Sequence, residues 1–138
     1  MGKSVADAVI DAALDHIATC TLITVCSGAS TPTDGTLASV TLASTAMTAG
    51  DGNDYTIAPG TSSGRKITTT QKSDVSITGT GTQTATHIAL SVGGAIKLCT
   101  TCTEQPLTNG GTVTIPAFTD EIADPDRKST RLNSSHRL

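Results

Sequence analysis

The fold is decided by the segment Thr84–Phe118, which reads TATHIALSVGGAIKLCTTCTEQPLTNGGTVTIPAF. It contains two apolar-rich runs, His87–Val92 and Ala95–Cys99, separated only by Gly93-Gly94. A two-residue glycine loop favours a tight hairpin, because glycine tolerates positive φ at both central positions. A third run, Thr112–Ile115, follows a second glycine-containing turn signal. The segment therefore predicts three consecutive antiparallel strands.

Composition extends this pattern to the whole chain. The 138 residues favour one domain, expected over residues 1–125. Roughly a fifth of the residues are threonine, which favours strands, and the chain has one Tyr, one Phe and no Trp, so aliphatic side chains must fill the core. Turn signals recur at short spacing. The sequence therefore predicts an all-β, antiparallel β-sandwich, jelly-roll-like, of about seven to eight strands with one short N-terminal α-helix.

The helix is predicted over Ser4–Thr19. Ser4 is a candidate N-cap, and Asp7 follows three residues later as in a capping box. One apolar stripe at helical spacing comprises Val9, Ile10, Ala13, Leu14 and Ile17. The row Asp7, Asp11 and Asp15 favours solubility. We expect the helix to close one side or end of a sheet; the alternative is a helix that docks on a neighbouring subunit.

Further strands are predicted before the hairpin. Leu22–Cys26 is apolar on both faces, which indicates a central strand covered on both sides. Leu37–Leu42 alternates with Thr and Ser and predicts a half-buried strand, and Arg65–Thr70 and Asp74–Thr80 predict two more. The polar stretch Ala43–Gly64, with Tyr55 and Ile57 as its only apolar anchors, is predicted to be a long surface loop, either one that contacts partners or one that is mobile in the isolated protein.

The C-terminal end differs from the rest of the chain. Asp126–His136 reads DRKSTRLNSSH and resembles the conceptual translation of a sequencing adapter. Residues 126–138 are therefore expected to be an artefactual, disordered tail; the alternative is a genuine basic tail for an acidic partner. Without this tail, five basic and eleven acidic residues remain, which argues against nucleic acid and anionic membranes as partners. No signal peptide or membrane span is predicted, so folding in a cytoplasm is expected.

Four cysteines form two spaced pairs. Cys99-x2-Cys102 has the spacing of a zinc knuckle or a redox pair. Cys20-x5-Cys26 does not supply a matching second pair, and no helix follows Cys102 as a thioredoxin-like motif requires. We therefore predict buried apolar thiols, with Cys20 and Cys26 facing one core because their strand parity is the same. A zinc-stabilised module with Cys99 and Cys102 as ligands is the lesser alternative.

No set of residues specifies a reaction. His16 and His87 could be combined with Ser27 as a Ser-His-Asp site, but a nucleophile-elbow pattern is missing. The glycine-rich strings lack the Gly-Lys-Ser/Thr of a phosphate loop, and the acidic stretch 51–54 lacks the closing Glu of a calcium loop. The sequence therefore predicts a protein that is not an enzyme, with no catalytic residue and no cofactor.

A cell-surface or carbohydrate-binding β-domain is the main alternative. Such domains stack sugars on exposed aromatic rings, which offer flat apolar faces. This chain has only Tyr55 and Phe118 for that purpose. The same shortage argues against single-stranded nucleic acid.

Five short motifs follow one another in a fixed order: Ala13-Leu14-Asp15-His16-Ile17, Cys26-Ser27-Gly28, Gly64-Arg65-Lys66-Ile67-Thr68, Ala85-Thr86-His87-Ile88-Ala89-Leu90 and Asn109-Gly110-Gly111-Thr112-Val113-Thr114-Ile115. Their order over Ala6–Pro125 resembles a family of small structural proteins of tailed bacteriophages, found among head and tail genes. The resemblance implies a virion subunit that forms homo-oligomers, binds other virion proteins and carries no enzymatic residues. Family members have an aromatic residue where Ile88 stands, and small residues near Cys99 and Cys102. The closing segment Phe118–Pro125 is less apolar than the family's, so the pattern assigns no clear strand there.

Overall fold

The structure is a computed structural model that describes residues 6–61 and 63–123. The elements in chain order are α1 (Asp7–Ile17), β1 (Leu22–Ser27), α2 (Leu37–Val40), β2 (Thr41–Ala46), β3 (Tyr55–Pro59), β4 (Arg65–Thr69), β5 (Lys72–Ser76), β6 (Thr82–Val92), β7 (Ala95–Thr108), β8 (Thr112–Ile115) and β9 (Thr119–Ile122). The fold is all-β and sandwich-like, as predicted, with nine strands rather than seven to eight among the described residues. The predicted tail, 126–138, lies outside the described residues.

A four-stranded antiparallel sheet, in the order β2-β1-β6-β7, forms one layer. The predicted hairpin is confirmed: Gly93 and Gly94, with φ of 59° and 85°, join β6 to β7. The predicted central position of β1 is also confirmed, because it pairs with β2 on one side and β6 on the other. The structure extends β7 well beyond Cys99, to Thr108.

The third of the three consecutive strands predicted from Thr84–Phe118 does not pair with the second. β8 pairs with β5 and not with β7, so the prediction of three consecutive paired strands is wrong. The turn after β7 is the physical reason. The Gly110 N–H donates to the Ile77 carbonyl over 3.1 Å, and the Ile77 N–H donates to the Gly111 carbonyl over 2.9 Å. These bonds hold the turn against the segment after β5, so the chain enters the second layer.

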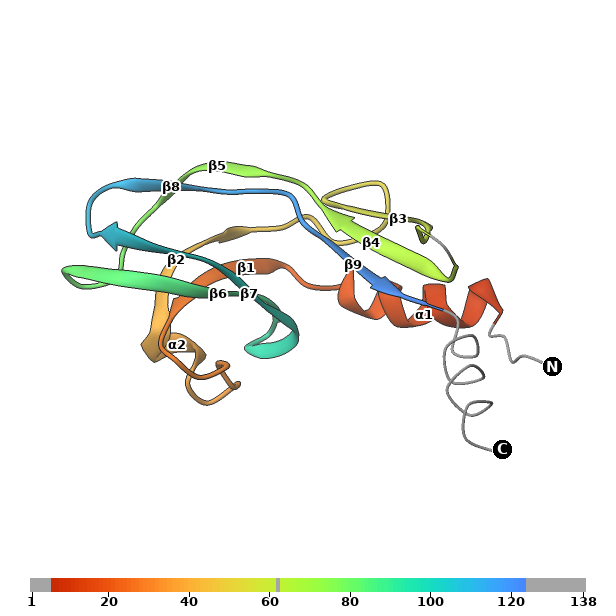
Figure 1. Cartoon of the computed structure of the whole chain (residues 1–138), viewed down its shortest axis with the longest axis horizontal. Coiled ribbons are helices and arrows are strands. Elements are labelled where there is room, and N and C mark those ends of the chain that lie inside the picture. Colours follow the sequence, from red (N-terminus) through yellow and green to blue (C-terminus); the bar gives the residue numbers. More distant parts are fainter. Residues whose placement is uncertain (1–5, 62, 124–138) are drawn as a thin grey trace, which may run out of the picture.

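The second layer is a long ribbon in which β4 and β5 run beside β9 and β8 (Figure 1). Its β5-β8 half covers the four-stranded sheet, whereas its β3-β4-β9 half covers α1. Pro116 separates β8 from β9 and cannot donate a ladder hydrogen bond. The Thr69 N–H donates to the Phe118 carbonyl over 2.9 Å just beyond this break. The segment that the family pattern left unassigned thus contains strand β9.

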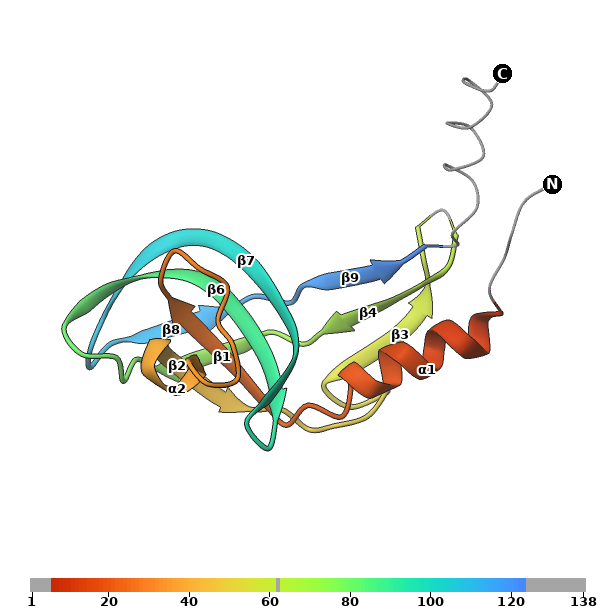
Figure 2. The same cartoon turned by 90° about the horizontal axis from the view of Figure 1, so that it is seen from below.

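Helix α1 lies along β3 and β4, as Figure 2 shows. Ile10 and Leu14 are buried, but Val9 is 62% exposed and Ala13 is also exposed, so the predicted stripe is only partly correct. A helix on one side of a three-stranded sheet buries a narrow face. The predicted cap is wrong as well. Ala6 occupies the N-cap position without a side-chain hydrogen bond, and Ser4 lies outside the described residues.

The predicted strand Leu37–Leu42 is wrong in its first four residues, which form the short helix α2. Hydroxyl groups explain the difference, because Ser and Thr side chains offer local alternatives to a sheet ladder. The Thr33 N–H donates to the Thr36 hydroxyl over 2.9 Å, and the Ser39 hydroxyl donates to the Thr36 carbonyl over 2.8 Å. Strand β2 begins only after this local network ends.

The predicted surface loop Ala43–Gly64 is wrong at two strands and at its buried side chains. Strand β2 continues to Ala46, strand β3 lies further along, and Ala43, Met47 and Tyr55 are buried. Tyr55 is fully buried because its hydroxyl finds a partner, donating to the Cys20 carbonyl over 2.9 Å. A segment of polar composition therefore supplies a central core side chain.

Two apolar clusters cover the two faces of the four-stranded sheet. The larger runs without a break from α1 to β8 and includes Ile10, Leu14, Ile23 and Ile115. The smaller lies on the opposite face, under α2, and comprises Cys26, Leu37 and Ala89 with the half-buried Val40, Ile96 and Cys99. No helix in residues 6–61 and 63–123 is long and apolar enough to cross a membrane.

Candidate functional site

In the loop between β2 and β3, the carboxylates of Asp51 and Asp54 accept hydrogen bonds from N–H, hydroxyl and ammonium groups of the same chain. Asp54 accepts hydrogen bonds from the Thr48 N–H at 2.6 Å, the Thr70 hydroxyl at 2.7 Å and the Lys72 ammonium at 2.9 Å. Asp51 accepts a hydrogen bond from the N–H of residue 57 over 2.9 Å. The two carboxylates accept hydrogen bonds from different donors and share none of them. These bonds fix the loop in place, and we call such a side chain a structural clamp.

The interactions of Asp54 make the free energy of unfolding depend on pH. The Thr48 N–H, followed by the Thr70 hydroxyl and then Lys72, lowers the pKa of Asp54 to about 2. This is below the value of about 3.9 in an unfolded chain, so the stabilisation is fully present above about pH 4 and is lost as the pH falls toward 2. We expect Asp54→Asn to lower the free energy of unfolding by about 2 kcal/mol at neutral pH. Urea unfolding across a pH series measures the difference, which should shrink to nearly zero near pH 2.

Asp15→Asn is the matched control for this variant, because Asp15 is exposed on α1. It should leave the free energy of unfolding nearly unchanged at neutral pH. A gap between wild type and Asp54→Asn that stays constant from neutral pH to pH 2 would contradict the assigned role of the carboxylate.

The four cysteines do not form one site. Cys99 packs against the smaller cluster and Cys102 against the larger one. Residues three apart in a strand point to opposite faces, so strand β7 separates the two candidate zinc ligands. The expectation that Cys20 and Cys26 face one core is wrong, because Cys20 belongs to the larger cluster and Cys26 to the smaller. Within the described part of the chain, no three His, Cys, Asp or Glu side chains gather as a metal site.

The buried thiols should react more slowly than the half-buried ones. Burial, with smaller effects of Cys99 and Cys102, raises the pKa of Cys26 to about 12, and burial also raises the pKa of Cys20. A pKa near 12 cuts the thiolate fraction of Cys26 roughly a thousandfold relative to a free cysteine. We expect alkylation of the folded protein to label Cys102 and Cys99 first, and Cys26 only after unfolding. Peptide mapping by mass spectrometry measures the order, and zinc should leave it unchanged. Equal rates for Cys26 and Cys102 would contradict the buried position of β1.

The two candidate histidines, His16 and His87, are not assembled with Ser27 into a Ser-His-Asp site. His87 is buried in β6, and its Nδ1 lies 2.8 Å from the Thr86 hydroxyl. The Ser27 hydroxyl instead donates to the Val40 carbonyl over 3.4 Å. His16 is exposed in the last turn of α1. The hydroxyl and the two imidazoles therefore occupy separate environments.

The aromatic residues do not form a stacking platform. Tyr55, one of the two aromatic rings that could stack on a sugar, is fully buried, and Phe118 is half-buried against the larger cluster. A ring without an exposed face cannot stack on a sugar. The structure thus contradicts the assignment of Tyr55 to glycan binding.

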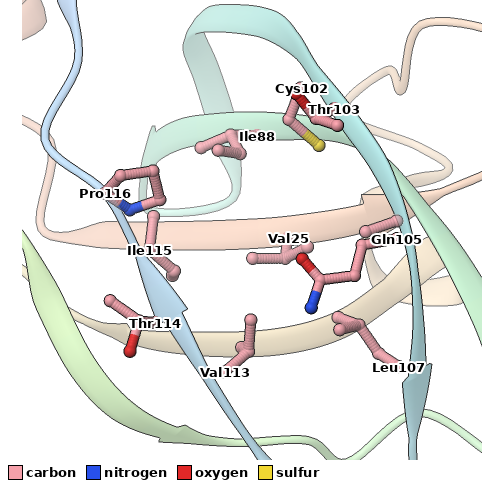
Figure 3. A pocket seen from close by; sticks show the side chains of 11 residues that line it. Val25, Ile88, Cys102, Thr103, Gln105, Leu107, Val113, Thr114, Ile115 and Pro116 are labelled. Atoms are coloured by element: carbon pink, nitrogen blue, oxygen red, sulfur yellow. The ribbon is translucent and has the colours of Figure 1, made fainter.

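A groove between β7 and β8 is the candidate functional site. The opposite side of the sandwich is closed, because the Thr78 and Gly79 N–H groups both donate to the Leu42 carbonyl beside β2. Among the described residues, no backbone hydrogen bond joins β7 to β8. The groove has a volume of about 150 Å³ and exposes part of the larger cluster. Figure 3 shows Leu107 of β7 and Val113 of β8 on its two sides.

The lining decides what this groove can accept. Its apolar wall includes Val25, Ile88, Cys102, Leu107, Val113 and Ile115. Thr103, Gln105 and Thr114 lie among them, and none of the described residues that line the groove is charged. The groove therefore suits an uncharged, largely apolar group. An apolar cavity of this size can hold a group about as large as benzene.

Sequence reasoning missed this site because it ended the strand at Cys99. The residues that form the rim, Thr100–Thr108, include Glu104 and Pro106, which depress strand propensity. The available signal was the apolar Leu107 just before the Asn109-Gly110 turn, which would have extended the strand to that turn. Comparison with protein-family models, with curated proteins and with solved structures finds no match to this chain.

Proposed function

We propose that this chain is a non-enzymatic structural subunit of a bacteriophage virion, either tail-associated or head-decorating. It folds in the host cytoplasm and acts in the particle through contacts with copies of itself and with other virion proteins. The ordered motifs that resemble phage structural proteins suggest this role. The sandwich-like fold is in keeping with the β-sandwich subunit that the resemblance implies.

The observation that carries the proposal is the use of polar side chains as internal clamps. The Glu121 carboxylate accepts hydrogen bonds from the Thr61 N–H over 2.9 Å and from the Thr61 hydroxyl over 2.7 Å. Asp34 accepts a hydrogen bond from the Ile96 N–H over 2.8 Å. Each bond joins residues about 60 positions apart and holds a loop against a strand. Side chains committed in this way favour a rigid building block over a reactive site.

The test is the location of the protein. Particles purified from the culture that carries the gene should contain peptides of this chain in stoichiometric amounts, as mass spectrometry would measure. Sequencing through both flanks of the gene should find portal, capsid or tail genes beside it, and their order would separate a head role from a tail role. Absence from purified particles, together with flanking genes of bacterial metabolism or surface structures, would overturn the proposal.

A further inference from the structure

We propose that Asn109 is a site of spontaneous covalent modification, at which the backbone nitrogen of Gly110 displaces the side-chain amide nitrogen, and that the fold controls the rate of this deamidation. The reacting groups lie in the turn between β7 and β8. This inference does not depend on the virion role, since it concerns only the chemistry of one turn.

Water is the only co-reactant, and hydroxide acts as the base. The deprotonated Gly110 nitrogen attacks the Asn109 Cγ, a C–N bond forms, and the side-chain nitrogen takes up a proton and leaves as ammonia. Water then opens the resulting succinimide ring at either carbonyl. The products are an aspartate and an isoaspartate, in which the chain continues through the side-chain carbon. The net reaction converts an amide and water into a carboxylate and ammonium.

The residue that follows the asparagine decides how easily the ring closes. Of the asparagines in the sequence, only Asn109 is followed by glycine. Glycine has no Cβ, so the attacking nitrogen is unshielded and its backbone reaches conformations that other residues avoid. Asn109 and Gly110 are both exposed, and a Cβ at Gly110 would meet no atom within 4 Å. Water and hydroxide therefore have open access to the turn.

In the folded chain, both reacting groups are held by hydrogen bonds. The Gly110 N–H donates to the Ile77 carbonyl over 3.1 Å, and the Asn109 Nδ2 donates to the Thr78 carbonyl over 3.2 Å. A nitrogen that donates its proton to a carbonyl oxygen is harder to deprotonate, because a hydrogen bond to the neutral form disfavours the charged form. The reaction therefore requires the turn to move away from the segment after β5.

The hydrogen bonds of this turn favour such local opening. The bonds donated by Gly110 and by the Asn109 side chain are at the long end of the range for N–H···O hydrogen bonds. A third bond, from the Asn109 N–H to the Gly81 carbonyl, also has an exposed donor residue. Solvent-exposed backbone hydrogen bonds open at a lower free energy than the whole fold does. The rate of deamidation in the native protein should thus report the opening of this turn.

The modification would weaken the contact that leads the chain into the second layer. The Asn109 amide donates to the Thr78 carbonyl, whereas a carboxylate only accepts hydrogen bonds. The product therefore sets negative oxygens against a carbonyl oxygen. The pairing of β8 with β5 begins at Thr112, opposite Ser76, close to this turn. Deamidation should accordingly loosen that end of the β5-β8 pair.

The test is incubation of the full chain at mildly alkaline pH, with and without denaturing urea. Peptide mapping by chromatography and mass spectrometry separates the asparagine, aspartate and isoaspartate forms. Asn109 should be converted in both samples, but roughly tenfold or more slowly in the folded protein, because only the open turn reacts. Asn53 is the internal control. It is followed by Asp54, and its amide donates to the Ala49 carbonyl over 2.8 Å, so it should react much more slowly than Asn109 in both samples.

Gly79→Ala tests the control by the fold without altering either reacting residue. A Cβ at Gly79 would crowd Leu42, so the segment that holds the turn must shift. Deamidation of the folded protein should then accelerate roughly tenfold. Ile67→Val is the matched control, since it removes a buried methyl group from β4, at the other end of the second layer (Figure 1). It should leave the rate at Asn109 unchanged, and circular dichroism establishes that both variants are folded.

Asn109→Asp carries the charge of the product and tests its effect on the turn. Amide hydrogen exchange at Gly110 and Gly111 should be faster in this variant than in Asn109→Ser, which adds no charge. Equal exchange in the two variants would contradict the loosening of the turn.

An Asn109 that stays intact in the folded protein while the unfolded chain is converted overturns the inference, as does an Asn109 that stays intact in urea. Equal rates in the folded and unfolded chains overturn the control by the fold, as does a Gly79→Ala rate equal to that of the wild type. A chain found in particles with an unreactive Asn109 would overturn this inference alone.

Discussion

Tyr55→Ala should lower the free energy of unfolding by about 3–5 kcal/mol, the range for removing a large aromatic side chain from a core. Tyr55 is fully buried, with 0% of its surface accessible to solvent, and it packs in the larger cluster. Its hydroxyl also ties β3 to the Cys20 carbonyl, in the connection between α1 and β1. Truncation therefore creates a cavity and leaves a buried carbonyl without its donor. Urea unfolding followed by circular dichroism measures the loss.

Tyr55→Phe separates the two effects. It keeps the ring and removes only the hydroxyl, so we expect a loss of about 1–2 kcal/mol from the unpaired Cys20 carbonyl. A loss below about 1 kcal/mol for Tyr55→Ala would show that the core around this residue is not packed as described. Because the side chain is buried, any loss of ligand binding in Tyr55→Ala would report unfolding rather than a removed contact.

Gly64→Ala should cost about 3 kcal/mol or more, through strain and overpacking together. Gly64 precedes β4 with φ of 71°, a left-handed conformation in which a Cβ is unfavourable. A Cβ at this position would also overlap the Ile122 carbonyl oxygen and crowd the Ala123 backbone. Since backbone atoms cannot rotate away as a flexible side chain can, β9 would have to move from β4. Thermal unfolding should show a correspondingly lower melting temperature.

Gly81→Ala is the matched control for this prediction. Gly81 has a similar φ of 64°, but a Cβ there would meet no atom within 4 Å. Its loss should be about 1 kcal/mol, the cost of the backbone conformation alone. Equal losses for the two variants would mean that β9 is not packed closely against the turn before β4.

The strongest local patterns predicted the fold best. The Gly93-Gly94 hairpin and the central strand β1 are where the sequence places them, because turn chemistry and continuous apolar runs depend on neighbouring residues alone. Strand β8 also exists where predicted, but its partner is β5. Pairing between distant strands depends on where a turn directs the chain, and the Gly110–Ile77 contact that directs it is not a local pattern.

The cysteines show when strand parity predicts the face of the sheet on which a side chain lies. The spacing of Cys99 and Cys102 matches a zinc motif, but their opposite strand parity places them on opposite faces of the sheet. The same rule failed for Cys20 and Cys26, because Cys20 precedes β1 and lies outside the alternation of that strand. Parity is informative only between residues of one continuous strand.

By itself, the sequence determined the all-β class, the Gly93-Gly94 hairpin and the helical segment near the N-terminus. These properties follow from turn residues, apolar periodicity and composition, which act over a few residues. Only the tertiary structure decided that Tyr55 lies in the core, that Asp54 acts as a clamp and that β7 borders an open apolar groove. Each of these depends on contacts between residues distant in the chain, whose partners are set by the packing of two layers rather than by any local pattern.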